Sequence, residues 1–106
     1  MGDSITITVY SGLNDESRLA EEIARKAQLF LAVEYGIPVE VDVVKVPVSI
    51  EEARDMGLPT VIVEGREVSS GGVPLLADII DAVFDEIREE YGLARTGLPE
   101  IGLAMV

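Results

Sequence analysis

The segment GLPTVIVEGREVSSGG, residues 57 to 72, decides the fold class of this chain. A proline precedes the apolar run 60–63, which is typical of a buried strand, and Gly65 marks a tight turn into a second short strand at 66–70. A turn this short makes the two strands antiparallel. The Gly71-Gly72 pair then ends the second strand. The segment therefore predicts a β-hairpin with one buried strand.

Three further elements are indicated upstream of this hairpin. Within residues 4–12 the apolar β-branched residues Ile5, Ile7 and Val9 alternate with Thr6, Thr8 and Tyr10, which predicts a strand. A helix is expected over residues 14–36, with Asn14 or Asp15 as its N-cap and Gly36 as its stop. In residues 38–46 valines alternate with acidic residues, which predicts a strand with one face exposed to solvent, as is possible at the edge of a sheet.

The remaining elements are a short and a long helix. Ser49, followed by glutamates, predicts a short capped helix over residues 49–57. The segment from Pro74 to Gly92 is strongly amphipathic and reads as the last helix. Residues 1–92 are therefore expected to form the domain, and residues 93–106 an apolar C-terminal tail packed on the domain or on a second subunit.

The expected order is β-α-β-α-β-β-α. A right-handed crossover makes the first two strands parallel, and the short turn makes the last two antiparallel. We therefore predict an α/β domain with a mixed four-stranded sheet flanked by helices. The competing β-α-β-β-α-β sandwich needs a strand after the last helix, and no convincing one follows.

Composition excludes several classes of function. A formal charge of -12 repels phosphate backbones and anionic lipids, so we expect neither nucleic-acid nor membrane binding. No apolar run spans a bilayer and the start lacks a signal-peptide pattern, which favours a cytoplasmic protein. The chain contains no Cys and no His, and its 106 residues hold a single domain. Six Arg against two Lys fit a thermophilic or halophilic source.

Residues 58–68 and 69–74 resemble the second half of the thioredoxin and glutaredoxin superfamily, in particular its small archaeal and bacterial redox-active disulfide proteins. The resemblance runs from Ile5 to about Val83 and implies a thioredoxin-like fold. It also implies that Pro59 follows a cis peptide bond and lies beside the loop that begins at Gly12. In that family the backbone next to this proline offers a strand-like edge to a bound peptide.

The first half of the motif departs from the family. In GLNDESRL, residues 12–19, Leu13 and Glu16 stand where the family has its two cysteines. Thiol–disulfide exchange is therefore excluded, and no catalytic residue is assigned. We expect a non-catalytic protein-binding or assembly module with an unknown protein partner. Its candidate cleft comprises Gly12, Leu13, Asn14, Asp15, Glu16, Leu58, Pro59, Thr60, Gly71 and Gly72.

A second hypothesis uses the same cleft for a small molecule. Asp15, Glu16 and Arg66 could bind a ligand or act in a carboxylate-based enzyme. Carboxylates at a helix start also serve as caps and as partners of the helix dipole, which is the interpretation we favour for Asn14 to Glu16. Gly71-Gly72 reads as a simple turn rather than a glutathione-binding edge. We expect no cofactor and no metal site.

The first helix carries more apolar surface than one core face needs. Leu19, Ile23, Ala27 and Phe30 share the stripe expected to face inward. A second apolar surface should cover the tail or another subunit, which predicts a homodimer. Its candidate interface residues are Leu29, Ala32, Val33, Leu98, Ile101 and Leu103.

Overall fold

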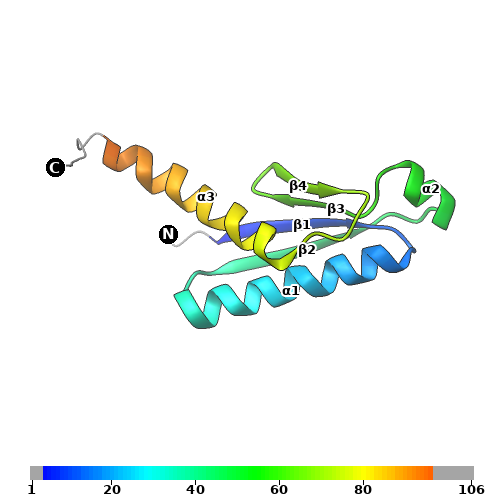
Figure 1. Ribbon diagram of the computed structural model, residues 1–106, viewed down its shortest axis with the longest axis horizontal. Helices are drawn as coiled ribbons and strands as arrows, with labels where there is room; N and C mark the ends of the chain where they lie inside the picture. Colours follow the sequence, from blue (N-terminus) through cyan, green and yellow to red (C-terminus); the bar gives the residue numbers. More distant parts are fainter. Residues whose placement is uncertain (1–3, 97–106) are drawn as a thin grey trace.

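The computed structural model describes the backbone of residues 4–96 and the side chains of residues 4–89. Seven elements follow one another in the predicted order (Figure 1). They are β1 (Ile5–Ser11), α1 (Asp15–Tyr35), β2 (Val39–Lys45), α2 (Ile50–Asp55), β3 (Thr60–Val63), β4 (Arg66–Ser70) and α3 (Leu76–Thr96).

The four strands form one mixed sheet in the order β2-β1-β3-β4. β1 pairs with β2 in parallel and with β3 antiparallel, and β3 pairs antiparallel with β4. The α/β class, the mixed sheet and the position of β2 at an edge confirm the predictions. In the centre, Ile7 lies opposite Val63 and Val9 opposite Val61, and all four side chains are buried. Their shared face is the floor of the core.

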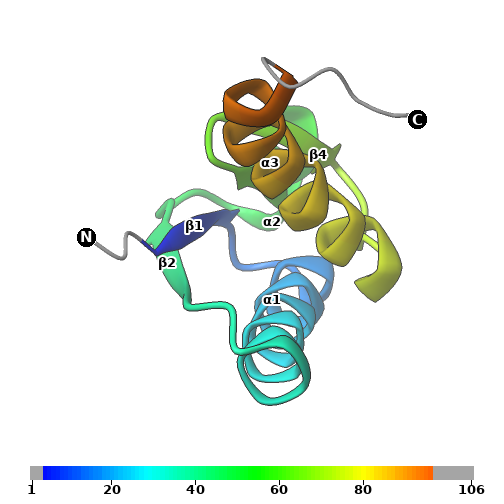
Figure 2. The same ribbon diagram turned by 90° about the vertical axis from the view of Figure 1, so that its left-hand side faces the viewer.

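Both long helices cover this same face of the sheet. α1 lies over β1 and β2, α3 lies over β3 and β4, and the two helices also contact each other. Figure 2 shows them together on one side, with α2 near the far end of the sheet. Among the described residues no helix covers the opposite face, where Thr6, Thr8 and Tyr10 of β1 are partly exposed. The predicted flanking helices thus lie on one face, because α2 has only six residues and lies at one end of the sheet.

The inward face of α1 also differs from the prediction. Ala20, Ala24, Ala27 and Leu31 are fully buried. Of the four residues predicted to face inward, Ala27 is buried and Ile23 packs against the core, whereas Leu19 and Phe30 are exposed. Three alanines at helical spacing let the helix approach the sheet closely, and the larger residues then lie at the margin. The predicted stripe was rotated away from the true one by about one residue.

Helix ends follow the sequence signals, with one exception. α1 ends at Gly36, which adopts the left-handed conformation with φ of 66°. α2 begins with a capping box in which Ser49 and Glu52 bond each other's backbone. α3 continues through Gly92 to Thr96, so the boundary expected at residue 92 lies inside a helix. Tail residues Leu98, Ile101 and Leu103 lie outside the described part.

Candidate functional site

The loop between β1 and α1 is held by a chain of buried hydrogen bonds. The Gly12 amide donates to Ser17 Oγ at 2.8 Å, and the Ser17 hydroxyl donates to Asn14 Oδ1 at 2.5 Å. Asn14 Nδ2 then donates to the carbonyl of Leu58 at 3.1 Å. Asn14 occupies the N-cap position, but its side chain makes no cap hydrogen bond. The predicted N-cap position of Asn14 is confirmed, but its side chain ties the loop to the segment before β3 instead of capping the helix.

The backbone beside Pro59 is already occupied by intramolecular bonds. The Leu58 amide donates to the carbonyl of Ala53 at 2.8 Å, and the Leu58 carbonyl accepts from Asn14. Pro59 has no N–H, and its carbonyl accepts from the Gly71 amide at 2.9 Å. The Leu58–Pro59 peptide bond is cis, and both residues are buried. Addition of a peptide strand needs free main-chain groups, and this segment has none to offer.

Close packing explains the glycine at position 12. A Cβ placed on Gly12 would lie 2.7 Å from Cβ of Ala53 and 3.3 Å from Cδ1 of Leu58. The loop, α2 and the segment before β3 therefore meet at a point with no room for a side chain. We call the Gly12–Ser17 loop together with Leu58, Pro59 and Gly71 the loop end of the molecule.

A recess opens to solvent on the outer side of this loop. It has a volume of about 280 Å³ and is lined by Gly12, Leu13, Asn14, Arg18, Glu21 and Lys45. Glu21 Oε2 accepts from Ser11 Oγ at 2.5 Å and from Lys45 Nζ at 2.8 Å. Burial raises the pKa of Glu21, but the bonds from Lys45 and Ser11 outweigh burial and leave that pKa below its usual value. The recess therefore has a wall formed by a paired, ionised carboxylate.

The structure divides the predicted cleft into two parts. Gly12, Asn14, Leu58, Pro59 and Gly71 come together, as expected, but they form a closed contact rather than an open cleft. Leu13 is exposed and lines the recess. The recess is not lined by Asp15, Glu16, Thr60 or Gly72. Thr60 instead donates from its hydroxyl to the Gly57 carbonyl at 2.8 Å.

Sequence reasoning missed four polar side chains of this region. Ser17, Ser11, Glu21 and Lys45 carry its hydrogen bonds, yet none was proposed as a site residue. Only Ser17 had a local signal, since it stands three residues after Asn14 at the helix start. The pairing of Lys45 with Glu21 depends on the packing of β2 against α1, which no short motif encodes.

Arg66 lies at the opposite end of β3 from Pro59. It is paired with Val63, whereas Thr60 is paired with Ser70. Its guanidinium contacts three carboxylates of α3: Glu89 at 2.5 Å, Glu86 at 3.4 Å and Asp85 at 3.9 Å. The hydrogen bond that Arg66 donates to Glu89 raises the pKa of Arg66. The hypothesis that Arg66 shares a cleft with Asp15 and Glu16 is therefore wrong.

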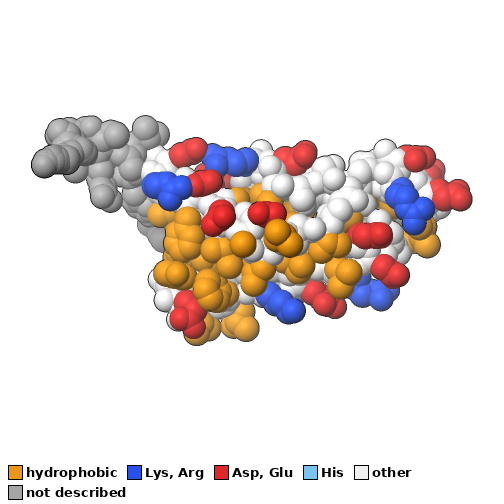
Figure 3. Space-filling model, in the orientation of Figure 1, with side chains coloured by type: hydrophobic (Ala, Val, Ile, Leu, Met, Phe, Trp, Pro, Cys, Tyr) orange, Lys and Arg blue, Asp and Glu red, His pale blue; other side chains and the backbone are white. Residues whose placement is uncertain are grey.

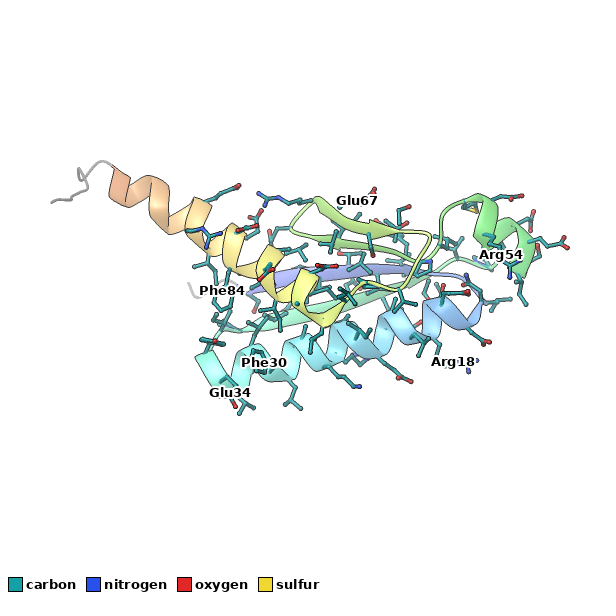
Figure 4. The ribbon with its side chains drawn as sticks, in the orientation of Figure 1. Arg18, Phe30, Glu34, Arg54, Glu67 and Phe84 are labelled. Carbon is teal, nitrogen blue, oxygen red and sulfur yellow. The ribbon has the colours of Figure 1, made fainter. Side chains whose placement is uncertain are left out.

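A large apolar surface lies at the other end of α1. The side chains of Leu29 and Val33 are 65% and 69% exposed, and Phe30 and Tyr35 are exposed as well. Tyr35 packs edge-on against Phe30 at 5.8 Å and against Phe84 of α3 at 5.0 Å between ring centroids. Figure 4 labels Phe30 and Phe84 close together. We call the surface formed by Leu29, Phe30, Val33, Tyr35 and Phe84 the helix face.

The helix face belongs to a wider apolar band. Figure 3 shows hydrophobic side chains gathered over α1 and α3, with charged side chains along the margins. Ala32, the third interface residue expected on α1, is also exposed. Monomeric proteins seldom leave a contiguous apolar area of this kind in water.

Several site types find no support among the residues described. Within residues 4–89 no group of three or more acidic side chains is arranged to hold a metal ion. None of the described helices carries an apolar stretch that would cross a membrane. No family model and no curated protein matches this chain.

Proposed function

We propose that this protein is a non-catalytic protein-binding or assembly module on a cysteine-free thioredoxin-like scaffold, and that it associates through the helix face. Two features support the scaffold: the order of its elements, and the position of the Gly12 loop beside Pro59. Thiol exchange is excluded, because the chain has no Cys.

The single observation that carries this proposal is the exposed helix face. Burial of one Leu or Phe side chain is worth about 1.5–3 kcal/mol, so several such residues on one surface favour association strongly. The cleft beside Pro59, which the sequence put forward, supports binding less well. Its main-chain groups are already paired, and Leu58 and Pro59 are buried.

The proposal can be tested by the size of the assemblies that the chain forms. The size of the untagged protein is measured in two settings. The purified protein is measured by light scattering, and the protein in an extract of the source organism is located among size fractions by immunodetection. The variant Leu29→Asp/Val33→Asp removes the helix face at its two most exposed positions. The control Ile50→Asp/Met56→Asp changes an exposed apolar residue of α2 and the exposed residue at its C-cap instead.

We expect the parent and the control to run above the monomer mass in at least one setting, and the helix-face variant to run as a monomer in both. A parent that is monomeric in both settings overturns the proposal. An assembly that keeps its size in the helix-face variant overturns the choice of surface.

A second candidate function is supported by the recess. Polar groups form much of its lining, and Arg18, which has no ion-pair partner among residues 4–89, could face an anionic group. Asp15 and Arg66 play no part in this version, since neither lines the recess. Chemical-shift changes confined to Gly12, Leu13 and Lys45 on addition of a small carboxylate would support it, and an unchanged spectrum at millimolar ligand would exclude that ligand class.

A further inference from the structure

We infer that the partner of the helix face is a second copy of this chain, packed so that α1 of each copy lies across α3 of the other. This inference rests on the proposed function, because it names the partner for the same surface. The symmetry is a two-fold axis that lies in the interface and runs along the helices.

Charges at the margin of the helix face select this arrangement. Lys26 shares a side of α1 with Leu29, Phe30 and Val33, at the three-, four- and seven-residue spacing. Asp81 stands three residues before Phe84 on α3. Both charged side chains are exposed, and neither has an ion-pair partner among residues 4–89. Arg18 and Arg25 of α1 and Asp78 of α3 are likewise exposed and without an ion-pair partner among residues 4–89, so unpaired cations on α1 match unpaired anions on α3.

Lys26 and Asp81 also lie at the same level along the molecule. Tyr35 contacts both Phe30 and Phe84, so the three rings form one cluster at this end of the helix pair. α1 and α3 run in the same general direction (Figure 1). Lys26 is one turn before Phe30, and Asp81 is just under one turn before Phe84. A two-fold axis along the helices keeps this level, so Lys26 of each copy meets Asp81 of the other.

The alternative face-to-face pairing is less favourable. A two-fold axis across the helices would place α1 over α1 and α3 over α3. The acidic α3 would then meet its own copy, with the unpaired Asp78 and Asp81 on both sides. Like charges placed opposite one another at an interface disfavour that register strongly.

The helix pair is also large enough for a stable interface. A helix of 21 residues is about 31 Å long, and α1 and α3 contact each other before α3 diverges toward its C-terminal end (Figure 1). A standard interface takes about 800 Å² from each partner. That is roughly one eighth of the 6222 Å² surface of the chain. At a net charge of -12 per copy, self-association needs local charge matching of the kind that Lys26 and Asp81 provide.

The test is a charge exchange measured by sedimentation equilibrium on the full chain. Lys26→Glu and Asp81→Lys are made separately and together, and the double variant keeps the parent's net charge of -12. Arg54→Glu and Asp42→Lys, on exposed positions of α2 and β2, are the matched controls for each change of charge. Circular dichroism confirms that every variant is folded.

We expect the parent to form a dimer of twice 11.4 kDa. Each single exchange should raise the dissociation constant at least about tenfold, because the two-fold axis places every substitution at two sites of the interface. The double variant should recover the parent's constant to within about threefold, and the controls should leave it unchanged.

Three outcomes would overturn the inference. The first is a parent that is monomeric, and the second is a double variant whose dissociation constant is no lower than those of the single variants. The third is dimerisation that appears only when residues 97–106 are removed, which would show that the tail covers the helix face. A chain that is monomeric alone but assembles in the extract through Leu29 and Val33 would retain the proposed function and refute the second copy as partner.

Discussion

The loop end and the helix face are opposites in how they use their side chains. At the loop end, small and polar residues are buried, and Asn14, Ser17 and Leu58 satisfy one another through hydrogen bonds. On the helix face, large apolar residues remain in water, and Leu29 and Val33 have no cover within the described chain. The hydrogen bonds of the loop end are satisfied within one chain, whereas the apolar side chains of the helix face are buried only when another surface covers them.

This contrast separates stability from association. A buried polar contact loses energy when either partner is removed, because the remaining group is left unsatisfied. An exposed apolar residue can be changed with little effect on folding, but with a large effect on any complex that buries it. Substitutions at the two ends should therefore affect different measurements.

The largest effect is expected from Leu29→Asp on self-association. The change puts a carboxylate into both halves of a two-fold interface, and the dimer should weaken by about 3 kcal/mol or more. The free energy of unfolding of the monomer should change by less than about 0.5 kcal/mol. Light scattering over a concentration series measures the first quantity and urea denaturation the second. Leu13→Asp, at an equally exposed position of the loop end, is the control and should leave the dimer intact.

The next effect concerns packing at the loop end. Gly12→Ala would bring a methyl group to within 2.7 Å of the Cβ of Ala53, and neither atom can move without its backbone. We expect a loss of about 3 kcal/mol in the free energy of unfolding, measured by urea denaturation. Gly72→Ala is the control, since no atom lies within 4 Å of the added group. Equal stability of both variants would contradict the close contact.

Removal of the asparagine bridge should cost somewhat less. Asn14→Ala leaves the Leu58 carbonyl and the Ser17 hydroxyl without this partner, for a loss of about 2 kcal/mol. Asp15→Ala, one residue further and exposed, should lose less than about 0.5 kcal/mol. Thermal unfolding followed by circular dichroism compares the two. A dimer that dissociates in Asn14→Ala while the fold remains intact would remove the separation between the two ends.

The smallest effect is a pH dependence at Glu21. Its pKa in the folded chain lies below the usual 4.5, so the carboxylate stabilises the fold above that pH. This stabilisation is lost as the pH falls through the lowered pKa. The difference in unfolding free energy between the parent and Glu21→Gln should therefore be largest at neutral pH and shrink below about pH 4.5. Solvent screens the pair with Lys45, so the difference should stay below about 1 kcal/mol. A difference that grows in acid would contradict the assignment.

Local signals in the sequence identified the elements but not their faces. The hairpin at Gly65, the capping box at Ser49 and the stop at Gly36 were all read correctly, because each depends on neighbouring residues. The inward face of α1 was misjudged, because leucine and phenylalanine outweigh alanine in any measure of apolar periodicity. Close packing against the sheet favours Ala20 and Ala24 instead.

Contacts between distant residues were harder to foresee. The bond from Asn14 to Leu58 joins positions 44 residues apart, and the family resemblance alone brought these segments together. The resemblance did not indicate that the backbone beside Pro59 is already paired, since this depends on the placement of α2. Arg66 was assigned to the wrong end of the sheet, although the predicted turn at Gly65 already places it at the end of the hairpin away from Pro59.

The contacts of Arg66 have a further consequence, for behaviour on heating. One guanidinium joins the β3–β4 hairpin to three carboxylates of α3 and thereby fastens two elements that otherwise share few contacts. Charged groups lose part of their hydration free energy as the temperature rises, so forming such a network costs less in a hot solution than in a cool one. The interaction between the β3–β4 hairpin and α3 should therefore become stronger, relative to the other contacts of the domain, as the temperature rises toward unfolding.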